Sequence, residues 1–213
     1  MSATVIAGIE VPASSLMRDV TELVRESATP LLYHHSRRVF FWGALRGRKR
    51  GLDYDPELLY AGALFHDLGR TDRFSGSGQR FEIDGADEAR RVLLEHGVPS
   101  ERAHLVWEAI ALHTTPEIPW RMAPEIALVT AGVELDVLGF GYDEISDGER
   151  AEVTAAHPRP DFKREILRAF TDGMARRAHT TFGTVNADVL SHCLPGFERA
   201  DFVETILASR WTV

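Results

Sequence analysis

The sequence predicts an all-α fold, a single compact domain of about nine helices. Apolar residues recur at helical spacing along most of the 213 residues, and no segment sustains the alternation of a β-strand. Proline and acidic residues open several apolar runs, and glycine follows their ends. A chain of this length that is 44% hydrophobic can bury one substantial core. We therefore expect one domain over residues 1–213, with residues 145–213 packed on a motif-bearing core of residues 30–140.

The first predicted elements follow from capping signals. The twelve N-terminal residues lack periodicity and are expected to form an arm or a short strand. Ser14 and Ser15 then precede apolar residues at helical spacing up to Val24, as N-cap residues do. Thr29-Pro30 opens the next helix, which is expected over residues 31–48. Because that helix is apolar on most sides, we expect it in the centre of the domain.

The later elements are justified in the same way. Asp55-Pro56-Glu57 supplies an N-cap, a first-turn proline and a first-turn acid, and predicts a helix over residues 56–67 that Gly69 ends. Residues 70–84 contain a Ser/Gly tract and predict a loop at the rim of a site. The remaining helices are expected over residues 85–96, 100–113, 124–139, 147–155, 161–178, 186–193 and 198–209.

Composition limits the function classes. The formal net charge of −8 opposes nucleic acid and anionic membranes as partners, because both are bound through clustered Lys and Arg. Cys193 is the only cysteine, which excludes an internal disulfide and a cysteine-based zinc cluster. Neither a signal-peptide pattern nor an apolar run long enough to cross a bilayer is present, so we expect a cytoplasmic protein. A small-molecule substrate is the expected partner. The sequence does not decide whether the chain forms a homo-oligomer.

Polar side chains interrupt apolar helical segments at His34-His35, His66-Asp67, His113 and Asp136. Burying such groups without partners costs several kcal/mol, so partners are required. Imidazole nitrogens and carboxylate oxygens suit zinc, iron, manganese and magnesium without any cysteine. We expect one divalent metal ion, with zinc as the first choice. The alternative is a set of buried polar residues that satisfy one another.

The pattern of His35, His66-Asp67 and Asp136 resembles the HD-domain metalloprotein superfamily, in which a histidine, a His-Asp pair and a distant aspartate lie on successive helices. We assign His35, and not His34, as the expected metal ligand. It directly precedes the segment Ser36-Arg37-Arg38-Val39, and the ligand histidine of many relatives precedes a similar Ser/Thr-x-x-Val segment. Within the superfamily the chain is most similar to the cyanamide hydratase-like branch. The similarity rests on the motif His35-Ser36-x-Arg38-Val39 and on the segments 63–69, 81–86, 106–114 and 131–139.

The resemblance implies an all-α metalloenzyme whose metal ligands are His35, His66, Asp67 and Asp136. A cation held there would lower the pKa of water toward neutrality and orient a small electrophile. His113 is the favoured proton-transfer or substrate-polarising group; it could also complete a second metal site or cap a helix.

Further candidates surround this motif. Glu82 and Asp84 follow the predicted loop and are candidates for general acid or base, although they could equally mark a helix start with Asp84 as N-cap. Arg70 could bind substrate or cap a helix. At this position after the His-Asp-x-Gly motif, the superfamily's cyclic-dinucleotide phosphodiesterases typically have a lysine, and its nucleotidases have an acidic residue in this region. The arginine of this chain differs from both. Phe74 and Trp107 are expected to narrow the substrate pocket.

Three functions remain open at this point. The leading one is a metal-dependent hydrolase or hydro-lyase that activates water against a small molecule, for example a cyanamide- or nitrile-like compound. The second is a phosphohydrolase acting on a nucleotide or another phosphate monoester. The third is a non-catalytic helical module that a metal stabilises, in which protein ligands close around the ion.

Overall fold

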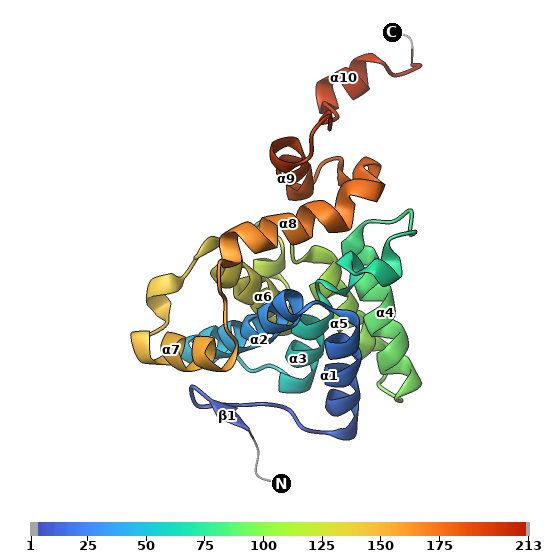
Figure 1. The fold of residues 1–213 in the computed structure, drawn as a ribbon. Helices are drawn as coiled ribbons and strands as arrows, with labels where there is room; N and C mark the ends of the chain where they lie inside the picture. The colour runs from blue at the N-terminus through green and yellow to red at the C-terminus, as the bar shows by residue number, and fades with distance from the viewer. Residues whose placement is uncertain (1–3, 212–213) are drawn as a thin grey trace.

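The structure is a computed structural model that describes residues 4–211, and it is all-α as the sequence predicts (Figure 1). Ten α-helices lie in this range, one for each of the helical ranges expected from the sequence, with short 3₁₀ segments and one π-helical turn. The N-terminal arm forms a two-stranded antiparallel hairpin, β1 (Val5–Ile6) and β2 (Ile9–Glu10). The helices are α1 Ser15–Ser27, α2 Pro30–Arg50, α3 Pro56–Phe65, α4 Phe81–Glu95, α5 Ser100–Leu112, α6 Pro124–Val133, α7 Asp147–Ala156, α8 Phe162–Met174, α9 Val185–Cys193 and α10 Phe202–Leu207.

The capping residues read from the sequence begin the first three helices. The Ser14 hydroxyl accepts a hydrogen bond from the Met17 amide at the start of α1. Thr29 begins α2 in the same way, and the Asp55 carboxylate accepts from two first-turn amides of α3. Each cap satisfies amides that have no partner inside the helix. The starts of these three helices are therefore encoded locally.

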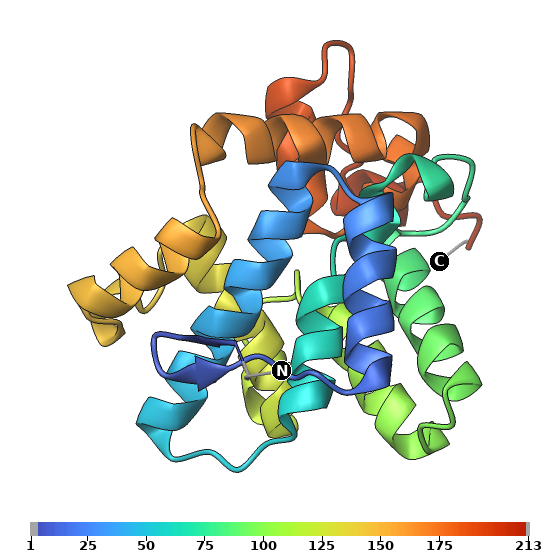
Figure 2. The same cartoon turned by 60° about the horizontal axis from the view of Figure 1, so that its bottom comes forward.

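Helix α2 runs through the centre of the bundle, as expected, and packs against α3 and α6 (Figure 2). Its middle is fully buried at Phe40, Phe41 and Leu45. Gly132 of α6 lets the two helices approach closely, because a Cβ at this position would collide with the Val39 carbonyl group. The first histidine of the motif therefore lies in the interior, surrounded by other helices.

Several element boundaries differ from the sequence prediction. Helix α3 ends at Phe65, and the predicted loop 70–84 begins with two 3₁₀ turns and ends inside α4, which starts at Phe81 after extended Arg80. The helix expected over 124–139 is α-helical only to Val133 and continues as the π turn η4 (Glu134–Leu138). Helix α10 has six residues and is shorter than expected.

Helix α8 lies across one end of the bundle, and α9 packs against it (Figures 1 and 2). Phe162 and Ile166 of α8 bury themselves against Leu32, while Met174 and Leu190 cover Phe81. Helix α10 projects away from the rest of the chain (Figure 1). Whether residues 145–213 belong to the same domain as the core stays a prediction. Within residues 4–211, no helix is both long and apolar enough to cross a bilayer.

Candidate metal centre

The His66-Asp67 pair lies where α3 ends and the chain turns sharply. His66 is the C-cap, with its amide bonded to the Gly62 carbonyl, and Asp67 leaves the helix before the 3₁₀ turn η1 (Leu68–Arg70). Gly69 permits this turn to lie against α4, because a Cβ there would collide with the Phe81 carbonyl group. Both His66 and Asp67 are buried. The turn therefore aims two adjacent polar side chains into the interior.

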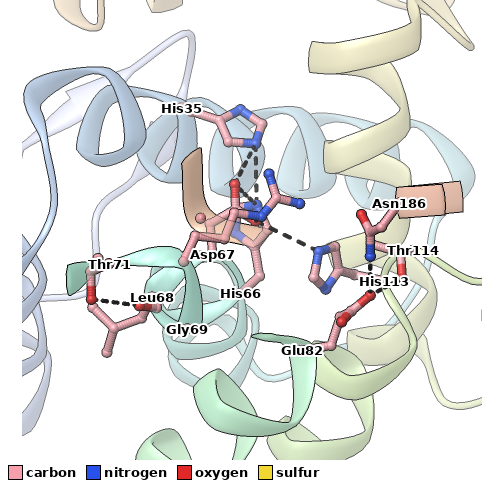
Figure 3. Close-up of polar contacts among 12 residues, drawn as sticks. His35, His66, Asp67, Leu68, Gly69, Thr71, Glu82, His113, Thr114 and Asn186 are labelled. Atoms are coloured by element: carbon pink, nitrogen blue, oxygen red, sulfur yellow. Dashed lines mark hydrogen bonds and ion pairs between the residues drawn. The ribbon is translucent and has the colours of Figure 1, made fainter. Parts of the chain in front are cut away.

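Three histidines from different helices present the same ring nitrogen toward Asp67 (Figure 3). His66 Nδ1 bonds the Ala63 carbonyl at 2.7 Å, and His113 Nδ1 bonds the Ile110 carbonyl at 2.6 Å. His35 Nδ1 bonds a carboxylate oxygen of Asp136 at 2.7 Å. Since these oxygens only accept, each Nδ1 carries the proton. Each Nε2 therefore keeps a free lone pair.

The Nε2 atoms of His35 and His66 face one another at 3.1 Å. Two neutral imidazoles in these tautomers cannot hydrogen-bond through those atoms, because both offer lone pairs. Burial lowers the pKa of His35, which disfavours a shared proton as the explanation. Nitrogens held about 2.0–2.1 Å from a tetrahedral zinc ion lie about 3.4 Å apart. The facing lone pairs thus fit a shared cation.

Asp67 supplies the negative charge of the group. Its Oδ2 lies 3.4 Å from His66 Nε2 and 3.6 Å from His35 Nε2, and its Oδ1 lies 3.7 Å from His113 Nε2. Both oxygens are buried without a hydrogen-bond donor. Burial alone would raise the pKa of this carboxyl, but Arg70 and His66 hold it well below its usual value. Arg70 Nε lies within ion-pair distance of Oδ1, whereas Oδ2 faces the two histidine nitrogens, and a buried carboxylate oxygen without a donor favours a cation beside it.

His35, His66 and Asp67 offer ligand atoms that all lie within 4.8 Å of one another. His113 adds a further buried Nε2 without a partner. Burial lowers the pKa of His113 to about 3, so the ring is neutral at physiological pH. Nitrogen and carboxylate donors of this kind suit zinc and other first-row divalent metals. The residues present therefore fit a divalent metal ion.

Asp136 lies on the other side of the His35 ring, against Nδ1, and is not part of this group. Its oxygens also accept hydrogen bonds from Arg38 Nε and Nη2, both at 2.9 Å, and from Trp42 Nε1 at 2.8 Å. Although burial raises the pKa of a carboxyl, His35 and Arg38 lower that of Asp136. In this arrangement Asp136 orients His35.

The structure places Glu82 and Asp84 in the first turn of α4, after the N-cap Arg80. Buried Glu82 accepts hydrogen bonds from Thr114 Oγ1 at 2.7 Å and Asn186 Nδ2 at 3.0 Å, beside His113 (Figure 3). The Arg80 hydrogen bond lowers its pKa, against the effect of burial. Asp84 pairs with buried Arg177. Both carboxylates are thus engaged in contacts between helices.

Arg70 lies beside the metal group. Its Nε is 3.2 Å from Asp67 Oδ1, and its guanidinium is stacked between the rings of Phe81 and Phe170. Nη1 is buried without a partner. Of the three residues expected to contact substrate, Arg70 lines the adjoining cavity, whereas Phe74 and Trp107 do not. Trp107 instead donates from Nε1 to Asp87.

A cavity of about 260 Å³ opens onto the histidines. His35, His66, Asp67, Arg70 and His113 line its inner end. The rest of its wall is mostly aliphatic or aromatic and comes from η4, α8, α9 and the end of α6, with Thr114, Thr115, Pro116 and Glu134 as the other lining residues. Sequence reasoning did not find the residues of α8 and α9, because apolar spacing marks a buried helix face without showing what that face covers. The aliphatic and aromatic wall residues are Val133, Val137, Leu138, Ile166, Leu167, Phe170, Val185 and Val189.

An all-helical bundle with a buried His-His-Asp group defines a class of metal-binding α-domain. The sequence model of the HD domain matches residues 32–138, half of the chain. The chain therefore belongs to the HD-domain family, as the resemblance implied. A search of curated proteins returned no match. HD domains are typically metal-dependent hydrolases, which agrees with the donor set described above.

Proposed function

We propose that this protein is a metal-dependent enzyme that activates water against a small, uncharged molecule. The observation that carries the proposal is the pair of facing Nε2 lone pairs of His35 and His66 beside Asp67, whose buried oxygens accept no hydrogen bond, at the inner end of a cavity. A purely structural site would have its ligands closed around the ion. A cavity that reaches the donor atoms favours turnover over the non-catalytic module.

His35, His66 and Asp67 would hold the ion, with His113 as the nearest further donor. A divalent ion supplies polarisation of a substrate and a lowered pKa of water. Zinc is the proposed metal because nitrogen donors outnumber the single carboxylate, and iron or manganese are alternatives. Asp136, a ligand in the sequence prediction, would orient His35 unless its carboxylate exchanges Arg38 and Trp42 for the metal.

The remaining groups have distinct tasks. His113 is neutral and offers Nε2 as an acceptor, so it can bind the metal or take a proton from water. Arg70 holds unpaired Nη1 beside the cavity and can donate a hydrogen bond to a substrate nitrogen or oxygen. The stacked position of its guanidinium between two aromatic rings preorganises that donor.

We propose hydration of a cyanamide- or nitrile-like carbon as the reaction, in keeping with the similarity to the cyanamide hydratase-like branch. Water adds across the carbon–nitrogen triple bond: one C–O bond and one N–H bond form while one C–N π bond is lost. Tautomerisation then moves the hydroxyl proton to nitrogen and replaces the second C–N π bond by the C=O π bond of the amide, so both water protons end on nitrogen. Cyanamide and nitriles are uncharged, and a mostly apolar cavity suits such a substrate. Arg70 is the only cationic side chain lining the cavity in the described residues, and Asp67 already pairs with it.

A phosphohydrolase is the second candidate. The unpaired Nη1 of Arg70 favours it, because a guanidinium can bind a phosphate oxygen. A phosphate monoester carries about two negative charges at neutral pH. Phosphoryl-transfer sites compensate such charge with several cations, whereas Arg70 is the one arginine or lysine that lines this cavity in the described residues and Glu134 adds a carboxylate. The hydration reaction is therefore the stronger proposal.

The test combines metal analysis with a substrate screen. The purified protein is expected to contain about one divalent ion per chain and to hydrate cyanamide or a nitrile without releasing phosphate from esters. Asp67→Ala should lose metal and turnover together. The control Asp172→Ala removes an exposed carboxylate of α8 and should change neither. Turnover by metal-free Asp67→Ala protein would overturn the proposal, and phosphate release alone would favour the second candidate.

A further inference from the structure

The inner and outer parts of the cavity differ in chemistry. The inner end holds the three histidines, Asp67 and Arg70. One side of the outer wall is formed by two helices that lie beyond the matched residues 32–138: α8 contributes Ile166, Leu167 and Phe170, and α9 contributes Val185 and Val189. None of these five side chains carries a polar atom. A substrate bound at the metal would therefore place its remaining atoms against an apolar surface.

This wall is anchored to the metal site at several points. Phe170 stacks on Arg70, and Gly173 lies so close that a Cβ would meet the Arg70 backbone. On α9, Asn186 donates to Glu82, which also accepts from Thr114 next to His113 (Figure 3). Side chains held by such contacts lose little additional entropy when a ligand binds. The part of the wall from α8 and α9 is thus held in a fixed position relative to the metal site.

The cavity is larger than the smallest substrate requires. A water molecule occupies about 30 Å³ in the liquid, and cyanamide has only three non-hydrogen atoms. A cavity of about 260 Å³ leaves most of its space beside α8 and α9 unfilled by cyanamide. Apolar atoms that leave water for this space would gain affinity in proportion to their buried area, about fourfold per methylene group.

We propose that α8 and α9 form a specificity subsite for an apolar substituent, so that the substrate is an alkyl- or aryl-substituted neutral compound whose polar head faces the metal group and Arg70. The inference rests on the proposed function for the identity of the head group. The apolar subsite itself depends only on the wall. Val189, half-buried on α9, and Leu167, partly exposed at the rim on α8, would set the preference for the substituent.

Calorimetry with unreactive probes tests the subsite on the zinc-loaded full chain. The probes are acetamide, butanamide and hexanamide, which share an uncharged head and differ in chain length. Affinity should rise at least tenfold from acetamide to hexanamide. Val189→Asn should weaken hexanamide binding about tenfold, change acetamide binding less than twofold and leave the zinc content unaltered. Leu167→Asn, at the exposed rim, provides a second variant whose folding is less at risk.

The matched control is Val203→Asn on α10, an exposed valine that does not line the cavity and should leave all three affinities unchanged. Equal affinity for acetamide and hexanamide, or unchanged hexanamide binding in both wall variants, would overturn the inference. Chain-length dependence without hydration of any nitrile would support the subsite and overturn the proposed function. Hydration of cyanamide with no chain-length dependence would support the function and overturn the subsite.

Discussion

At the scale of single residues, the protonation of His35 depends on Asp136. The carboxylate accepts from His35 Nδ1, so the lone pair of the ring stays at Nε2, where the metal group lies. Carboxylates that hydrogen-bond a metal-binding histidine commonly fix its tautomer and orientation. Arg38 and Trp42 hold the carboxylate in turn. Asp136 therefore matters for the metal even without touching it.

Asp136→Asn separates an orienting role from a ligand role. An amide keeps the shape but leaves buried Arg38 without its counter-charge, and removing one partner of a buried pair destabilises a protein by about 3–5 kcal/mol. If Asp136 orients His35, zinc affinity should fall about 10–100-fold and binding should persist. Zinc competition with a chelator and urea unfolding measure the two effects.

Glu144→Gln is the matched control, because it removes the carboxylate partner of buried Arg46 on the same helix, α2. It should lower the stability without changing zinc affinity. Complete loss of zinc binding by folded Asp136→Asn, with Glu144→Gln unaffected, would instead assign Asp136 as a direct ligand and contradict the orienting role.

At the scale of elements, the contact between η1 and α4 sets the position of Asp67. Gly69 leaves no space for a side chain against the Phe81 carbonyl group. Arg177 donates to the Gly69 carbonyl and pairs with Asp84, which ties this turn to α4 and to the chain after α8. The metal group therefore depends on packing two residues away from its ligands.

Gly69→Ala should force η1 and α4 apart and move Asp67. Overpacking of this kind costs about 1–3 kcal/mol, and a misplaced ligand weakens the metal site as well. We expect a lower urea midpoint together with reduced zinc affinity. In Gly148→Ala, the control in α7, the new methyl group meets nothing within 4 Å. That variant should keep its zinc affinity and gain up to about 1 kcal/mol of stability. Unchanged zinc affinity in Gly69→Ala would show that Asp67 does not depend on this contact.

Helix positions were largely predictable from the sequence because their signals are local. Asp55 and Pro56 mark the start of α3, and the apolar circumference of α2 correctly predicted a central helix. The π turn at Glu134–Leu138 was missed, because it widens the helix without any residue type that marks it. The early start of α4 was missed because Arg80 is not a typical N-cap residue.

In the candidate site, too, features that depend on local signals were predictable, and features that depend on tertiary packing were not. His35 lies within α2, and His66 and Asp67 lie at the end of α3, and these two helices are indicated by the sequence. The rotation of Asp136 toward His35 Nδ1 depends on the π turn, so spacing could not reveal it. The cavity wall of α8 and α9 depends on how two distant helices dock, which hydrophobic periodicity does not specify. The ligand types were thus predictable, whereas the shape of the substrate site was not.

At the scale of the whole molecule, the core encloses neutral histidines both in the metal group and outside it. His113 lies in the metal group, and His157 follows α7, where it stacks on Phe41 and contacts His34. Burial lowers the pKa of both to about 3, and positively charged Arg37 lowers that of His157 further. Folding therefore excludes two protons that the unfolded chain binds in mildly acidic solution.

The sign of the resulting pH dependence follows from proton uptake. An unfolded histidine binds its proton near pH 6.5, whereas His157 in the folded protein does so near pH 3. Between these values the unfolded chain holds more protons, so stability decreases as the pH falls, by about 1.4 kcal/mol per pH unit for each such histidine. Above about pH 6.5 this contribution is fully present. Acid should thus unfold the protein through its buried neutral groups.

His157→Phe isolates one of these contributions. The substitution replaces a buried imidazole that cannot be charged in the folded state by a ring of similar shape, so about 2 kcal/mol of the stability lost between pH 7 and pH 5 should disappear. Urea unfolding at both pH values, with chelator present so that metal release does not contribute, measures the difference. His104→Phe replaces a histidine that is half exposed and should leave the pH dependence unchanged. An equal pH dependence in wild type and His157→Phe would mean that His157 takes up its proton without unfolding, and would contradict its enclosure in the core.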